Sequence, residues 1–479
     1  MPSLFDNPLI KEKCQIFTPN DVVNQMLNYA NYCTNLYGKK ILDLSGGDGR
    51  FLIEIVHRYI IDCIEKGLSK KQIVSGLSSD IWGFELDKEH FETCIANQNE
   101  LVKEFGIDSV DWKIFNSDSL RNKIDEQFDY IVGNPPYLSY WDIPKPEREF
   151  IRSEYESCKN GASDYCFAFI ERALLLLNDK GVLVYIVPSS IFKTKAGKVI
   201  RSKIIPLLRA IYDFRTKKVF DNAITSSAII LLDKSISLDE LLYHDLAKER
   251  LIQIDKATLG DLWIFDKKRP QSFTYKYKFG DCFKVSSSVA TQCNEAFVLV
   301  NWNDDGEWLI SPDDEKVEMK AVRKAASPKG RISKRVEHII FPYYYEGQKR
   351  KTYPEGEYKE LFPNAYKHLL NYKDELLARD SDDKAAWYEY GRSQALYHLS
   401  QKKILMSSIV TNRVNIFILD ETEIPYSGFY IVPTGELTMD EAIQVLESNA
   451  FKEYVESVGI NVSGNSIRIT AKNISDFCW

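Results

Sequence analysis

Between about residue 40 and residue 235, short β-rich runs alternate with longer segments whose apolar residues recur at helical spacing. This alternation restricts the fold more than any other feature, because it is typical of a mostly parallel sheet covered by helices. Two helical segments, 50–67 and 164–181, end at a glycine that can cap a helix. The predicted strands are 39–47, 80–87, 112–118, 128–134, 181–189, 210–215 and 226–233. The sequence therefore predicts an open α/β domain.

The regular alternation stops beyond about residue 240, where aromatic segments, prolines and clusters of lysine and arginine follow. A chain of 479 residues also exceeds the size at which one hydrophobic core usually stops growing. We therefore predict two domains, residues 1–240 and residues 241–479, with a boundary between about 235 and 245.

Composition excludes several classes of protein. The chain is 44% hydrophobic and 27% charged, as an ordinary globular protein is. Its net charge of -7 still permits a local basic groove that binds phosphates. The nine cysteines include no C-x-x-C pair and the six histidines show no metal-ligand spacing, which predicts no metal site. Without an apolar run that could span a bilayer or direct export, we expect a cytoplasmic protein.

A small-residue loop follows the first predicted strand, whose last acidic residue is Asp43. The loop Ser45-Gly46-Gly47-Asp48-Gly49 then leads into a helix. Glycines let the backbone turn tightly and approach a ligand closely, at the carboxyl edge where ligands of parallel sheets bind. The loop predicts a nucleoside-type ligand, although a tight turn alone would use the same residues.

Two further strands also end in acidic residues. Glu85 lies at the end of the second predicted strand and can accept hydrogen bonds from both hydroxyls of a ribose. Asp118 lies at the end of the third and can accept one from an adenine amino group. Each is also explained as a solvated carboxylate at a strand end. Three such residues on successive strands favour a ligand site.

The fourth predicted strand ends in Asn134-Pro135-Pro136-Tyr137. The two prolines fix the backbone and hold the loop in one shape. An exocyclic amino group on a base is a poor nucleophile, and the side-chain oxygen of Asn134 with the carbonyl of Pro135 can accept its hydrogens. Tyr137 can stack on a base held out of a duplex. Taken alone, these residues are also explained as a proline-stiffened turn.

In this order the motifs resemble those of the S-adenosylmethionine-dependent amino-methyltransferases of DNA, in the gamma arrangement. The resemblance implies that Thr18 and Pro19 lie beside the methionine moiety of the cofactor, and that Asp43 lies near its amino acid part. It assigns the ribose to Glu85 and the cofactor adenine to Asp118. Two departures are the loop itself, which differs from the commoner D-P-A-C-G-S-G, and a serine after Asp118 where an apolar residue often stands.

Two aromatic residues take their roles from the same resemblance. Phe169, in the segment DYCFAFIERAL, matches a ring that lines the cofactor adenine. Phe220, in KKVFDNAITSSAIILL, matches the phenylalanine that packs on the flipped base opposite Tyr137. The family further implies a class I methyltransferase (Rossmann-like) fold, with a seven-stranded mixed sheet in the order 3-2-1-4-5-7-6. A C-terminal α+β target recognition domain would follow it.

The second half of the chain contains a strongly basic segment. Residues 320–335 hold seven basic and no acidic residues, and three more basic residues follow in EGQKRKTY. Such a cluster suits contacts to DNA phosphates, although a solvated basic face is the alternative. Double-stranded DNA is the predicted partner.

The leading hypothesis is methyl transfer from S-adenosylmethionine to N6 of adenine in duplex DNA at a specific short site. The rivals are an N4-cytosine methyltransferase, which more often carries Ser or Asp before the two prolines, a protein-glutamine methyltransferase, and a DNA-binding module without activity. We find no pattern for a nuclease domain. We therefore expect a monomeric modification enzyme that acts beside a separate restriction endonuclease.

Overall fold

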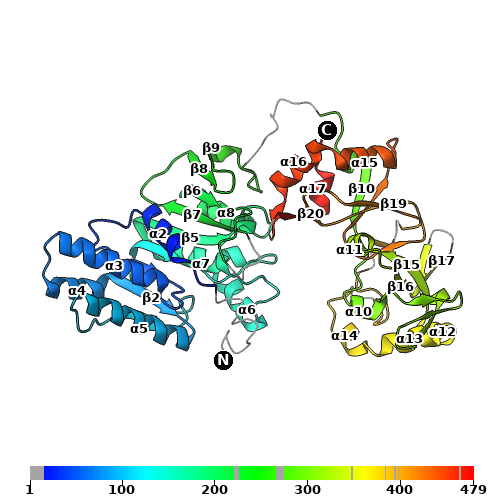
Figure 1. Cartoon of the computed structure of the whole chain (residues 1–479), viewed down its shortest axis with the longest axis horizontal. Coiled ribbons are helices and arrows are strands. Elements are labelled where there is room, and N and C mark those ends of the chain that lie inside the picture. Colours follow the sequence, from blue (N-terminus) through cyan, green and yellow to red (C-terminus); the bar gives the residue numbers. More distant parts are fainter. Residues whose placement is uncertain are drawn as a thin grey trace. The chain divides into compact units, whose positions relative to one another are not determined.

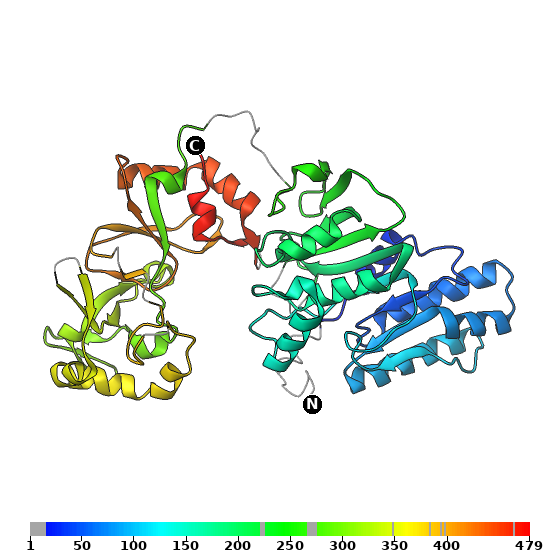
Figure 2. The ribbon, with the colours of Figure 1, turned by 180° about the vertical axis from the view of Figure 1, so that it is seen from behind.

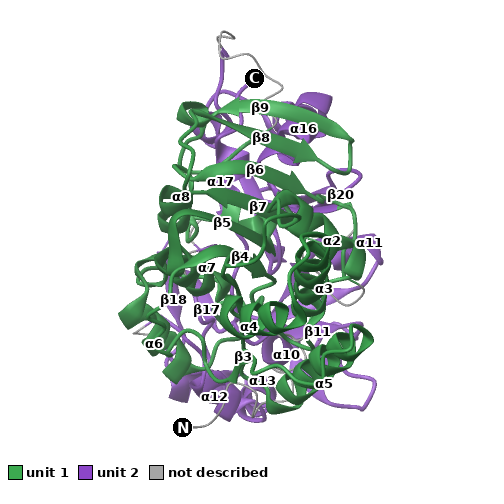
Figure 3. Cartoon of the chain, turned by 90° about the vertical axis from the view of Figure 1, so that its left-hand side faces the viewer, with its two compact units in different colours: residues 1–267, 460–465 green, residues 268–459, 466–479 purple. Residues whose placement is uncertain are grey.

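The computed structural model describes residues 16–220, 226–265, 275–346, 349–382, 385–392, 395–396, 399–462 and 465–479. The chain divides into two compact units, which are coloured separately in Figure 3. The first comprises residues 1–267 and 460–465, and the second comprises residues 268–459 and 466–479. Within the described ranges, no helix is both long enough and apolar enough to cross a membrane.

One sheet runs through the first unit, with its strands in the order β3-β2-β1-β4-β5-β7-β6-β8-β9. The part of this order from β4 to β9 can be followed in Figure 3. Its first seven positions confirm the order 3-2-1-4-5-7-6, and β7 is antiparallel to both β5 and β6. The strands are β1 Ile41–Asp43, β2 Ile81–Glu85, β3 Lys113–Asn116, β4 Phe128–Gly133, β5 Leu177–Pro188, β6 Leu208–Asp213, β7 Ser227–Asp233, β8 Glu240–Asp245 and β9 Arg250–Asp255.

The predicted count of seven strands was wrong, because the described part of this sheet has nine. The additional strand β8 pairs in parallel with β6, and β9 returns antiparallel beside it. The boundary predicted at 240/241 therefore cuts into β8, and the first unit extends to residue 267. No helix separates β8 from β9, so the strand–helix alternation that located the domain in the sequence is absent there.

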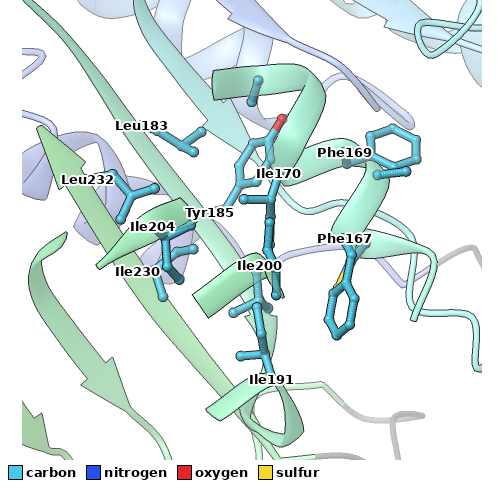
Figure 4. Close-up of a cluster of buried hydrophobic side chains, with 14 of the residues drawn as sticks. Phe167, Phe169, Ile170, Leu183, Tyr185, Ile191, Ile200, Ile204, Ile230 and Leu232 are labelled. Carbon is cyan, nitrogen blue, oxygen red and sulfur yellow. The ribbon is translucent and has the colours of Figure 1, made fainter. Parts of the chain in front are cut away.

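Helices cover both faces of the sheet (Figures 1 and 2). Along β5, Leu183 and Tyr185 contribute to one core while Val184 and Ile186 contribute to the other, as the period of two in a strand requires. Figure 4 shows the first core, where side chains of two helices meet those of β5 and β7. Helices on that face are α6 Lys145–Glu154, α7 Cys166–Leu176 and α8 Lys198–Ile204; those on the other are α2 Asn20–Tyr29, α3 Arg50–Glu65, α4 Lys70–Asp80 and α5 Lys88–Glu104.

The two glycine-terminated helices had different outcomes. The segment 50–67 is confirmed, because α3 ends at Glu65 and Gly67 follows with a φ of 70°. The segment 164–181 is not, because α7 already ends at Leu176 and β5 begins at the next residue. A Cβ on Gly181 would lie 2.6 Å from the Leu177 side chain and 2.9 Å from the Phe128 carbonyl oxygen. This glycine permits close packing inside the sheet instead of capping a helix.

The second unit consists of small, mainly antiparallel sheets with short helices. Its larger sheets have the orders β10-β23-β19-β21 and β11-β16-β15-β22. The strands are β10 Phe283–Ser287, β11 Val298–Val300, β15 Val322–Ala326, β16 Glu337–Ile340, β19 Lys403–Met406, β21 Ile416–Leu419, β22 Ile424–Pro425 and β23 Phe429–Pro433, with a hairpin of β17 Tyr343–Glu346 and β18 Lys349–Thr352. The main helices are α12 Glu355–Leu361, α13 Pro363–Leu370, α15 Met439–Glu447 and α16 Asn449–Val458.

Candidate active site

The glycine loop between β1 and α3 is held by backbone hydrogen bonds to the neighbouring strand. The Gly46 N–H donates to the Phe84 carbonyl over 2.8 Å, and the Gly47 N–H donates to Glu85 Oε2 over 2.7 Å. Gly47 and Gly49 have φ values of 56° and 91°, which L-residues rarely adopt. The loop therefore reaches its shape through its glycines and through a carboxylate on β2.

A cavity opens beside this loop at the carboxyl edge of the sheet. Among the residues predicted to bind the cofactor, six line it: Thr18, Ser45, Gly47, Glu85, Asp118 and Phe169. Gly46 and Asp48 of the same loop line it as well. Asn134 and Pro136 of the Asn-Pro-Pro-Tyr motif line the same cavity. The structure thus brings the end of β4 and the glycine loop, which are about 85 residues apart in sequence, to one site.

Asp43 and Gly49 do not line this cavity. Asp43 lies behind the loop, only 1% exposed, and its Oδ1 accepts a hydrogen bond from the Ser45 N–H over 3.0 Å. Burial, together with the nearby carboxylate of Glu85, raises the pKa of Asp43 to about 7. A Cβ on Gly49 would lie 2.8 Å from Cys94 Sγ on α5, so this glycine serves the packing of α3 against α5.

The two carboxylates that line the cavity are already partly engaged. Glu85 Oε1 accepts from the Asp87 N–H over 2.8 Å, and burial raises its pKa. Asp118 Oδ1 accepts from the Leu120 N–H over 2.9 Å, while Oδ2 pairs with Arg121. Because a carboxylate oxygen has two lone pairs, both groups retain acceptor capacity toward the cavity.

Asn134 has an amide whose orientation follows from its hydrogen bond. Nδ2 donates to the carbonyl of Ile16 over 2.9 Å, and a carbonyl can only accept, so the oxygen must point the other way. That oxygen, Asn134 Oδ1, is buried and has no hydrogen-bond partner among the described residues. Thr18 Oγ1 and Asp43 Oδ2 are likewise buried without a partner in the described ranges. Buried acceptors of this kind are costly unless water or a ligand satisfies them.

The remaining residues of the predicted base site lie together beside the cavity. The rings of Tyr137 and Phe220 contact each other edge to face, with centroids 6.2 Å apart and planes at 78°. Neither ring lines the cavity, and neither does Pro135. Desolvation raises the pKa of Tyr137 well above its usual range, so its hydroxyl stays neutral.

A buried charge network lies where the chain leaves β6 toward Phe220. The Tyr243 hydroxyl donates to Asp213 Oδ2 over 2.7 Å, and Arg215 Nε donates to the Tyr243 oxygen over 3.0 Å. Arg215 Nε also lies 3.2 Å from Asp245 Oδ2. Because Tyr243 and Asp245 belong to β8, the additional strand holds the start of the segment that bears Phe220.

Several residues of the site were missed in the sequence. Phe17 covers the loop, since its ring would meet a Cβ on Gly47 at 3.4 Å, and its ring packs against His90 with centroids 5.2 Å apart. The guanidinium of Arg50 lies 5.1 Å from the Phe17 centroid. Phe17 directly precedes Thr18, so the sequence could have indicated that it belongs to the site. His90 and Arg50 lie on helices, and no feature of the sequence marked them as site residues.

The basic segment 320–335 belongs to the second unit. Most of its charged side chains are exposed, including those of Lys320, Lys324, Lys329 and Lys334. Arg331 is half-buried and pairs with Glu423. The guanidinium of Arg323 lies 5.3 Å from the centroid of the Phe341 ring. The segment therefore presents cations at the surface of its own unit.

Residues 54–220 match the Eco57I restriction-modification methylase family. The Type II restriction enzyme and methyltransferase RM.Eco57I of Escherichia coli is 24% identical, over 83% of this chain and 49% of that protein. The Type II methyltransferase M.BstVI of Geobacillus stearothermophilus is 23% identical, over 95% of this chain and 88% of that protein. The chain thus spans about half the length of RM.Eco57I and most of M.BstVI.

Solved structures show a similar fold over almost the whole chain. The Type IIL restriction-modification enzyme MmeI, determined with DNA, superposes with a TM-score of 0.64 at 13% identity, covering 95% of this chain and 64% of that one. A nuclease-deletion mutant of the Type ISP enzyme LlaGI gives 0.56 at 15% identity, covering 96% and 46%. The similarity to the Eco57I restriction-modification methylase family thus covers residues 54–220, all of them in the first unit.

Proposed function

We propose that this chain transfers a methyl group from S-adenosylmethionine to N6 of an adenine turned out of duplex DNA, at a specific short site. The observation that carries the proposal is Asn134 Oδ1, an acceptor that is buried beside the cavity and unpartnered within the described residues. An exocyclic amino group has its lone pair delocalised into the base. An oriented acceptor that draws on its hydrogens makes that lone pair available.

The cavity residues suit the cofactor. Glu85 can accept hydrogen bonds from the ribose hydroxyls, and Asp118 can accept one from the adenine amino group beside the ring of Phe169. The unpartnered Thr18 Oγ1 would serve the charged amino acid part directly. Asp43 lies behind the loop and would support that part through its hydrogen bond from the Ser45 N–H. S-adenosylmethionine supplies an electrophilic methyl group when bound.

The motif residues act on the base. Asn134 Oδ1 and the Pro135 carbonyl accept the two amino hydrogens, and this directs the nitrogen lone pair toward the methyl group. As the nitrogen–carbon bond forms, the sulfur–carbon bond breaks with its electron pair on sulfur, and the surplus proton leaves to water. For Tyr137 and Phe220 to hold opposite faces of the base, their rings must separate to about 7 Å, twice a carbon–carbon contact of ~3.5 Å.

We assign target recognition to the second unit, whose exposed lysines suit DNA phosphates. The catalytic part would then be the first unit. For the assembly, we propose a monomer that acts beside a separate restriction endonuclease. For the activity, we propose a cytoplasmic location.

The test is incubation of purified protein with labelled cofactor and unmethylated DNA of varied sequence, followed by analysis of the nucleosides. N6-methyladenine is the expected product, and the absence of labelled adenine on all DNA would refute the proposal. Asn134→Ala should lower transfer at least about a hundredfold, since it removes an interaction that stabilises the transition state. It should leave cofactor affinity unchanged. Asn160→Ala, an exposed asparagine, is the matched control.

The same experiments separate the rivals. N4-methylcytosine among the products would identify a cytosine enzyme, and label in a protein substrate instead of DNA would indicate a glutamine methyltransferase. A chain without activity that still kept the fold would fail a cofactor titration. Expression in a host without adenine methylation, followed by single-molecule sequencing, would locate the modified site.

A further inference from the structure

A large aromatic side chain is exposed just after the Asn-Pro-Pro-Tyr motif. Trp141 is 74% exposed, although its neighbours Leu138 and Ile143 are fully buried. A tight turn holds it outward: the Asp142 N–H donates to the Ser139 carbonyl over 2.9 Å, and the Ser139 hydroxyl donates to Asp142 Oδ2 over 2.6 Å. Tryptophan is enriched at interaction surfaces, because its ring offers a large apolar contact area.

Cations lie beside this turn on helix α6. Lys145, Arg148 and Arg152 follow a spacing of three and four residues, which places them on one side of the helix. The guanidinium groups of Arg148 and Arg152 lie 4.9 and 5.2 Å from the centroid of the Tyr140 ring. Neither forms an ion pair within the described ranges. Glu149 is exposed and lies four residues after Lys145, so it is on the same side of the helix.

The opposite side of α6 is fixed to the cofactor cavity. Glu147 accepts from Arg121 Nη2 over 2.7 Å and from the Tyr165 hydroxyl over 2.9 Å. Arg121 also pairs with Asp118, which lines the cavity, and its guanidinium lies 3.8 Å from the Phe150 centroid. The helix is therefore held in a defined position relative to the candidate catalytic residues.

We propose that Tyr140, Trp141, Lys145, Arg148 and Arg152 form a DNA-contacting ridge next to the target base. Trp141 stacks on a base exposed when the target leaves the duplex, and the two arginines contact phosphates near it. This inference rests on the proposed function, because it takes DNA as the substrate.

The chemistry of the ridge favours nucleic acid as its partner. Removing a base from a duplex uncovers apolar faces of its neighbours, and an aromatic side chain that stacks there offsets part of the lost stacking. Arginines without an acidic partner supply the positive charge that phosphates attract. The ridge also begins only three residues after Tyr137, so it lies beside the point where the base would be held.

Trp141→Ala tests the stacking contact. We expect the KM for unmethylated plasmid DNA to rise about tenfold, while Trp141→Phe, which keeps a ring, stays within about threefold of the wild type. Leu175 is another exposed apolar residue, with 63% of its surface accessible, and Leu175→Ala should leave the KM for DNA unchanged. Affinity for S-adenosylmethionine should be unchanged in all three, since none of these side chains lines the cavity. When 2-aminopurine replaces the target adenine at a mapped site, its fluorescence should rise less on binding of Trp141→Ala than on binding of the wild type.

The double variant Arg148→Gln/Arg152→Gln tests the phosphate contacts. The slope of log K against log salt for binding a random-sequence duplex should fall by about 0.9 for each phosphate that the variant no longer neutralises. Lys71→Gln, an exposed lysine on α4, should leave the slope unchanged. Glu149→Gln should strengthen binding, because it removes a negative charge beside the ridge.

The outcomes separate the ridge from the function. If the wild type methylates DNA and the tryptophan and arginine variants have the same KM and salt slope as the wild type, the proposed DNA contact of the ridge is refuted and the proposed function is not. If the wild type transfers no methyl group, the proposed function fails, and the salt slopes still decide the ridge. A wild type that binds no DNA overturns both.

Discussion

Gly49 joins the glycine loop to helix α3. Its substitution can show whether this residue serves the packing of the helix or contacts the cofactor. The sequence predicted that it binds the cofactor, yet a Cβ at this position would point at α5, 2.8 Å from Cys94 Sγ and 3.1 Å from Gln98 Nε2. Gly67, at the other end of the same helix, has a similarly positive φ of 70° and open space around it. The two glycines therefore form a matched pair for substitution by alanine.

The expected magnitudes follow from these surroundings. An L-residue forced into a left-handed conformation costs about 1–2 kcal/mol, and both variants carry that term. Only Gly49→Ala adds an overpacked contact with a buried neighbour, which costs about 1–3 kcal/mol more. We therefore expect the free energy of unfolding to fall by about 1–2 kcal/mol for Gly67→Ala and by about 2–5 kcal/mol for Gly49→Ala.

Urea unfolding read by pulse proteolysis measures both values, and calorimetry of the folded protein measures cofactor affinity. Combining Gly49→Ala with Cys94→Ala should make the two losses less than additive, because the clashing sulfur is gone. Cofactor affinity of folded Gly49→Ala should remain within a few-fold of the wild type. Equal destabilisation by the two alanines, or a native-like stability of Gly49→Ala with abolished cofactor binding, would refute the packing role.

Two more predictions concern buried ionisable groups. The pKa of Asp43 is raised to about 7 in the folded chain, so between about pH 4 and about pH 7 the folded state keeps a proton that the unfolded state releases. The free energy of unfolding of the wild type, relative to that of Asp43→Asn, should therefore fall as the pH rises through this range, by at most ~1.4 kcal/mol per pH unit. Urea midpoints across that range check this, and a pH-independent difference would contradict it. Tyr243→Phe removes the hydroxyl between Asp213 and Arg215. It should lower the free energy of unfolding by about 1–3 kcal/mol and raise the KM for DNA. The control Tyr212→Phe on β6 should lower the free energy of unfolding by less than ~0.5 kcal/mol. Equal losses for the two tyrosines would argue against the network.

Local patterns were sufficient to predict much of the first unit. The strand–helix alternation predicted the sheet because strand and helix periodicities are properties of neighbouring residues. The loop after Asp43 and the motif at Asn134 both follow strands, so the rule that carboxyl ends of parallel strands meet at one edge placed them together, and Ser45, Gly47 and Asn134 do line one cavity. The strand order itself came from the family resemblance.

Long-range packing decided the rest. The direction of the Asn134 side-chain oxygen depends on the carbonyl of Ile16, 118 residues away, and no local pattern could orient that amide. The role of Gly49 depends on Cys94 of another helix, and the strands β8 and β9 join the sheet by pairing with β6, without the helical signal that marks the others. The sequence by itself determined which residue types stand at the strand ends. Only the tertiary structure decided which of their atoms face the cavity, because that depends on contacts between segments that no spacing along the chain records.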